Sequence, residues 1–200
     1  MAKSVWVGVS PSSGSGNANI AISSTAQHTG REVRSSNVTF KAANCEDVVV
    51  AVNQAGKPEN VSISASAAPP KMGQILTISG TTNSSKLTFA WGTGTLDLAL
   101  PDTYKANSVD TDNGVAIAGD PGAIAQIPFS IAITVPANDS VSTLTKQLIV
   151  TDDAGNSDIC LITQAAGDAY LTVTPLTVEL DWEGSAETVA VSSNVAWTIS

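Results

Sequence analysis

The stretch "IPFSIAITV", from Ile127 to Val135, decides the fold class of this chain. Every second residue in it is a large apolar one, and the residues between are smaller or polar. This period of two is typical of a β-strand with one face against a core. We expect further strands where the alternation recurs, at residues 20–22, 38–40, 48–52, 87–91, 96–100 and 176–182.

Turn-forming residues separate these expected strands. Gly, Asn, Asp and Pro provide the backbone conformations that tight turns need. No segment shows a convincing 3.6-residue period, which an amphipathic helix would require. We therefore predict an all-β protein of β-sandwich class. The turn clusters lie at residues 10–17, 79–85, 110–114, 120–122, 136–140 and 152–157.

The composition indicates an ordered, acidic protein. Of its 200 residues, 42% are hydrophobic and 14% are charged, which disfavours disorder. The net charge is −9, and nucleic-acid binding would need basic side chains to neutralise phosphates. The longest wholly apolar run, Val48–Val52, is far shorter than the roughly 20 residues of a membrane-spanning helix. We therefore expect neither a nucleic-acid nor a membrane partner.

Two similar short stretches suggest where domains end. "VNQAGKP" at residues 52–58 and "ITQAAGDAY" at residues 162–170 both place Gln-Ala after a β-branched region and before Gly. Each follows an expected strand. We therefore divide the chain into residues 1–58, 59–168 and 169–200. The middle part is long enough for a complete sandwich, whereas the outer parts would leave sheet edges or faces uncovered.

Two stretches resemble the BACON domain, an immunoglobulin-like (Ig-like) β-sandwich of Bacteroidetes proteins and of crAss-like bacteriophages. The stretch "VSPSSGSGNANIAIS", with "VNQAG" after it, is similar to the closing part of the family pattern. The stretch "LTVTPLTVELDWEGSAETVAVSSNVAWTIS" (171–200) is similar to the opening part. The middle part resembles a divergent bacterial Ig-like domain through "VTDDAGNSDICLITQAAG". The resemblance implies tandem Ig-like, BACON-like β-sandwich domains.

The reversed order of these parts leaves open how the last domain is completed. Its remaining strands lie beyond Ser200, or residues 1–58 supply them. In the second case the closure occurs within one chain, as in a circular permutation, or between two copies. Exchange between copies would use backbone hydrogen bonds for affinity.

Clustered carboxylates are the only hint of a chemical site. Such loops can bind calcium, but here Gly114 comes one position early and no suitable Glu follows. Asp and Asn also bond their own backbone in turns, which is the interpretation that we prefer. We predict no metal, no cofactor and no catalytic residue. The two clusters are Asp110, Asp112, Asn113 and Asp120, and Asp152, Asp153, Asn156 and Asp158.

The cysteines and the histidine indicate no catalytic or metal site. His28 is the only histidine and has no convincing nucleophile partner in the sequence. Cys45 and Cys160 lie in different expected domains. We interpret them as two small buried residues in a reducing compartment and not as a disulfide.

Two aromatic residues are candidates for a contact surface with a glycan or another subunit. Trp6 lies out of phase with Val5 and Val7, which claim the inner face of their strand. Tyr104 lies in the longest stretch without alternation, and long loops tend to be functional. Three other tryptophans share the phase of apolar neighbours and are predicted to lie in cores: Trp91, Trp182 and Trp197.

The resemblance and the composition together favour a non-enzymatic structural protein of a bacteriophage virion. A capsid-decorating or head-fibre protein would display Ig-like domains on the particle and adhere to host or mucin glycans. The start of the chain has no apolar signal region, so we expect synthesis in the bacterial cytoplasm and delivery on the virion. The expected partners are other virion proteins and further copies, with a trimer as one arrangement. The alternative is a cellular carbohydrate-binding module of a Bacteroidetes surface protein.

Overall fold

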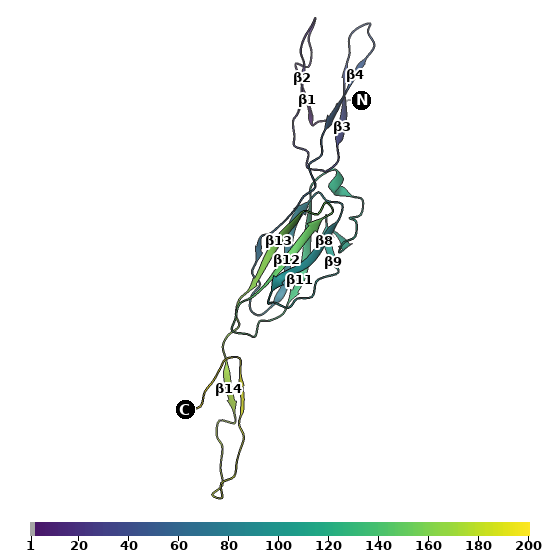
Figure 1. Cartoon of the computed structure of the whole chain (residues 1–200). Coiled ribbons are helices and arrows are strands. Elements are labelled where there is room, and N and C mark those ends of the chain that lie inside the picture. The colour runs from purple at the N-terminus through teal and green to yellow at the C-terminus, as the bar shows by residue number, and fades with distance from the viewer. Residues whose placement is uncertain (1–2) are drawn as a thin grey trace.

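The structure, a computed structural model, describes residues 3–200 and confirms the all-β class. Among these residues the only helix is one short 3-10 turn, η1 (Pro121–Ala123). Figure 1 shows an elongated molecule with a sandwich in the middle and hairpins at both ends. Within residues 3–200 no helix has the length and apolar content that crossing a bilayer demands.

Two sheets form the middle of the molecule. One has five strands in the order β10-β9-β11-β7-β5, and the other has four in the order β6-β13-β12-β8. All neighbouring strands are antiparallel except β13 and β6, which are parallel. The strands are β5 (Val61–Ile63), β6 (Ser66–Ala67), β7 (Gln74–Thr82), β8 (Leu87–Gly94), β9 (Thr103–Ala106), β10 (Val109–Asp112), β11 (Ile127–Val135), β12 (Leu144–Asp152) and β13 (Ser157–Gln164).

The alternation in the sequence builds the core between these sheets. The five large apolar residues of β11, from Ile127 to Val135, are all buried, as the pattern predicts. Residues from both sheets form one cluster of 19 buried hydrophobic side chains. Phe89 lies at its centre, with ring centroids 5.0 Å from Tyr104 and 5.9 Å from Phe129. Cys160 is buried in this cluster, whereas Cys45 is exposed, contrary to its prediction.

Two of the expected local structures in the sandwich are wrong. Residues 96–100 form no strand, although Leu96 and Leu98 are buried as their alternation requires. Residues 79–82 belong to β7 and not to a turn, because Ser79, Gly80, Thr81 and Thr82 pair with β11. Tertiary pairing therefore overrides the local preference of these small polar residues for turns.

The N-terminal part consists of two separate hairpins. One pairs β1 (Val7–Ser10) with β2 (Ala21–Ser24), and the other pairs β3 (Arg34–Phe40) with β4 (Val48–Gln54). No strand pairing joins the two hairpins in the described chain. They project from the same end of the sandwich as two arms (Figure 1).

The C-terminal part is one long hairpin at the opposite end of the sandwich (Figure 1). It pairs β14 (Leu171–Thr174) with β15 (Ala190–Ser193). Residues 176–182 were predicted as a strand, but they pair with no other segment of residues 3–200. The predicted domain boundaries after residues 58 and 168 fall in the connections to the hairpins, and the division into three domains stays a prediction.

Candidate functional site

The two N-terminal hairpins enclose a groove. It has a volume of about 500 Å³ and lies between the β1–β2 and β3–β4 hairpins. Its apolar lining includes Val9, Ile20, Val38 and Phe40, and the lysines of the lining are Lys3 and Lys41. We call this space the N-terminal groove.

The base of the N-terminal groove is held by contacts between the hairpins. The Arg34 guanidinium lies 4.6 Å from the centroid of the Trp6 ring, which is a cation–π arrangement. Arg34 Nε also donates to Gln54 Oε1 at 2.8 Å, and Gln54 Nε2 donates to the Ala26 carbonyl. Trp6 is half-buried here, so part of its ring is already covered by the chain itself. Its predicted contact with a glycan or a subunit stays a prediction.

A polar joint fixes these hairpins to the sandwich. Arg31 forms a bidentate ion pair with Asp120, and the amides of Arg31 and Glu32 donate to the carbonyls of Gly122 and Ala123. A Cβ atom on Gly30 would lie 2.3 Å from the backbone carbon of Ile124, so only glycine permits this approach.

Asn83 completes this joint from within the sandwich. It is fully buried, and its amide group donates to the carbonyls of Lys57 and Pro58 while its oxygen accepts from Asn60. This role was not predicted from the sequence, because Asn83 lies in a stretch expected to be a turn. The joint therefore depends on residues far apart along the chain, which local patterns do not reveal.

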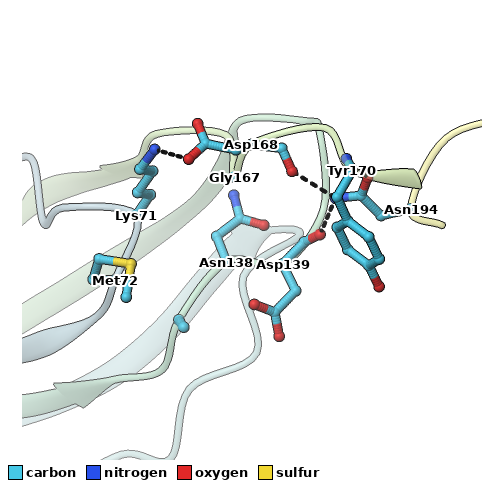
Figure 2. A pocket seen from close by; sticks show the side chains of 9 residues that line it. Lys71, Met72, Asn138, Asp139, Gly167, Asp168, Tyr170 and Asn194 are labelled. Atoms are coloured by element: carbon cyan, nitrogen blue, oxygen red, sulfur yellow. Dashed lines mark hydrogen bonds and ion pairs between the residues drawn. The ribbon is translucent and has the colours of Figure 1, made fainter. Parts of the chain in front are cut away.

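A second joint fixes the C-terminal hairpin, and Figure 2 shows it from close by. Asn194 Nδ2 donates to the carbonyls of Asp139 and Asp168 at 2.8 and 2.9 Å, and its oxygen accepts from the Tyr170 amide. Lys71 pairs with the Asp168 carboxylate beside it. A cavity of about 190 Å³ lies among these residues. These hydrogen bonds and the ion pair hold the hairpin against the sandwich.

The C-terminal hairpin exposes side chains that the sequence assigned to a core. We call residues 171–199 the C-terminal arm. Trp182 is 93% exposed, Trp197 is 47% exposed, and Leu176 and Leu180 are also exposed. The core predictions for Trp182 and Trp197 are therefore wrong for a single copy, because no sheet covers the arm. Trp91, by contrast, packs against the buried core as predicted.

Tyr104 is not part of a contact surface. The expected long loop instead contains the β9–β10 hairpin, and the Tyr104 side chain is 2% exposed. Burial raises the pKa of its phenol above the ordinary 10.0, although the nearby Leu87 backbone acts in the opposite direction. The hydroxyl has no hydrogen-bond partner of normal geometry. The prediction failed because the alternation of this strand, Tyr104 and Ala106 inward, is only two residues long.

The clustered carboxylates have structural partners. Asp110 pairs with Lys105, Asp120 with Arg31 and Asp153 with Lys86. Asp152 accepts from Asn156, and Asp158 accepts from the Ile63 amide at 2.9 Å. In residues 3–200 no three His, Cys, Asp or Glu side chains gather as a metal site would need.

Comparison with protein-family models gives no match, and comparison with curated proteins gives none either. The candidate functional surfaces therefore rest on the geometry alone. They are the N-terminal groove and the C-terminal arm. The hairpins that form them lie at opposite ends of the sandwich (Figure 1).

Proposed function

We propose that this chain is a non-enzymatic structural protein of a bacteriophage virion, of capsid-decorating or head-fibre type. In this proposal its sandwich domains are Ig-like and stand in a row on the particle. The observation that carries the structural role is the pair of polar joints. A closed sandwich with hairpins fixed at both ends is suited to serve as a stiff spacer.

The joints support stiffness because each connects a hairpin region to the sandwich through several hydrogen bonds or ion pairs. Arg31, Asp120 and Asn83 hold one end, and Asn194 holds the other by donating to the carbonyls of Asp139 and Asp168. Charge-assisted and buried hydrogen bonds of this kind fix orientation more firmly than a flexible linker does. The virion location rests on the resemblance to BACON domains of crAss-like bacteriophages.

Mass spectrometry of purified particles tests the location. Particles of a phage that encodes this chain should contain its peptides in amounts comparable with other minor capsid proteins. The peptides should remain with the particles through density-gradient purification. A chain found only in the lysate and never on particles would overturn the virion proposal.

Glycan adhesion is the second candidate, and the exposed ring of Trp182 favours it. A flat aromatic ring can stack against the apolar face of a sugar. A glycan array with the full chain and with Trp182→Ala tests this function. Binding that Trp182→Ala abolishes would support adhesion, and no binding at high protein concentration would leave the structural role alone.

A further inference from the structure

We infer that the C-terminal arm of one copy docks in the N-terminal groove of a second copy. The two surfaces lie at opposite ends of each molecule, so the contact joins copies head to tail. This deepens the proposed structural role by naming its partner, a second copy of this chain.

The C-terminal arm has the pattern of a core strand without a core. Large apolar residues alternate with polar ones from Leu176 to Trp182, yet residues 169–200 contain no buried hydrophobic side chain. Residues 176–180 also take part in no strand pairing within the described chain. Their apolar face and their backbone hydrogen-bonding groups are both available to another chain.

The hairpins around the N-terminal groove lack a strand that would cover their apolar side chains. Residues 3–58 contribute only two buried hydrophobic side chains, Val7 and Val38, against 19 in the sandwich core. Val9, Ile20 and Phe40 line the groove beside Val38 but remain partly open to solvent. Apolar side chains of both hairpins, beside serines and glycines of the loop between β1 and β2, line a space of about 500 Å³ that can take the apolar side chains of an extended segment.

Charge complementarity selects the C-terminal arm as the occupant. Residues 1–58 have five basic and three acidic side chains, a net charge of +2. Two of the lysines line the groove: Lys3, which donates to the Val7 carbonyl, and Lys41, which pairs with Asp47 and would exchange this partner for a carboxylate of the arm. Residues 169–200 have four acidic side chains and no basic one, a net charge of −4. The acidic residues of the arm are Glu179, Asp181, Glu183 and Glu187.

One molecule cannot make this contact with itself. The whole sandwich lies between the two ends (Figure 1). Hydrogen bonds of the two joints fix both hairpin regions to it. When two identical molecules join through two different surfaces, each pair still has one free groove and one free arm. Further copies can therefore add, which produces open rows or closed rings. Self-association should therefore continue beyond a dimer.

Two full-length variants test the contact. Leu180→Asp places a charge in the arm, and Phe40→Asp places one in the groove beside an acidic occupant. Both residues are exposed in the single copy, so neither change disturbs the sandwich core. Ile75→Asp, at a 70% exposed position on β7, is the matched control outside both surfaces.

Sedimentation analysis over a concentration series gives the readout. The average mass measured for the wild-type chain and for Ile75→Asp should rise with concentration to more than twice the 20.3 kDa of one chain. Leu180→Asp and Phe40→Asp should each remain monomeric. An equimolar mixture of these two variants should form a dimer and stop there, because only one intact groove can meet one intact arm. Added salt should weaken the wild-type association, as expected for opposite charges.

Three results would overturn the inference. They are a wild-type chain that stays monomeric at millimolar concentration, variants that associate like the wild type, and a variant mixture that does not pair. Circular dichroism of each variant, matching the wild type, shows that the fold is intact. None of these results bears on the virion proposal, which particle composition tests separately.

Discussion

At the scale of single residues, the buried hydroxyl of Tyr104 costs stability. Within residues 3–200 it has no hydrogen-bond partner of normal geometry, and an unpaired buried polar group is unfavourable by roughly 1–3 kcal/mol. Tyr104→Phe keeps the ring against Phe89 and removes the hydroxyl. We expect the variant to be more stable by about 1 kcal/mol in urea unfolding. A clear loss of stability would show that the hydroxyl has a partner.

The ion pair of Arg31 and Asp120 makes the N-terminal joint sensitive to acid. The hydrogen bond from Arg31 lowers the pKa of Asp120 below its ordinary 3.8, and this outweighs the opposing effect of burial. A lowered pKa in the folded state means that the pair stabilises the joint fully above pH 3.8. That stabilisation is lost as the pH falls through the folded pKa.

Hydrogen exchange of the Arg31 and Glu32 amides checks this prediction. Between pH 5 and pH 3 their protection, corrected for intrinsic rates, should fall in the wild-type chain. Asp120→Asn should show the lower protection at both pH values and lose about 1 kcal/mol or less at neutral pH. Asp181 in the C-terminal arm, whose pKa is lowered by the backbone amide of Ser185, lies away from this joint, so the amide of Ser185 serves as a separate acid-sensitive reference.

At the scale of elements, burial separates the strands of the sandwich core from the exposed C-terminal arm. Leu148 in β12 is fully buried, and Leu148→Ala should destabilise the sandwich by roughly 2–5 kcal/mol. Val178→Ala, in the C-terminal arm, shortens a side chain that is 38% exposed and belongs to no buried cluster of residues 3–200. We expect it to change the unfolding free energy of the single copy by less than about 0.5 kcal/mol. A large loss for Val178→Ala would mean that the arm is covered within one chain.

Period-two alternation predicted some of the covered strands, whereas residues 96–100 alternate without forming a strand and residues 79–82 of β7 were expected in a turn. β11 is the clearest case, since its five large apolar residues all reach the core. The alternation at residues 176–182 is as regular, yet no strand pairs with it. Pattern alone shows that a face is apolar, and it cannot show whether the same molecule supplies the cover.

The joints could not be predicted in the same way. Asn83, Arg31 and Asn194 act through partners dozens of residues away, and nothing periodic marks them. The groove escaped prediction for a similar reason, since it depends on how two hairpins are spaced. Asp120 was noted only as a possible calcium ligand, although its contact with Arg31 defines its role.

At the scale of the whole molecule, the fixed joints predict an extended particle in solution. A compact chain of this length would have a radius of gyration of about 16 Å. Small-angle scattering at concentrations where the chain is monomeric should give a clearly larger value. Asp120→Asn should leave the maximum dimension similar, and its normalised Kratky plot should indicate greater flexibility than that of the wild type. A value near that of a compact globule would show that the ends fold back on the sandwich.

The unlike character of the two ends has one more consequence. A molecule with a cavity at its head and a protruding segment at its tail is polar, so every row of such molecules has a direction. In a row built by the proposed contact, one terminus has an empty N-terminal groove and the other has an undocked C-terminal arm. An anchoring protein that binds the free groove or the free arm would fix the direction of the row. A copy that lacks the C-terminal arm would end the row and so set its length.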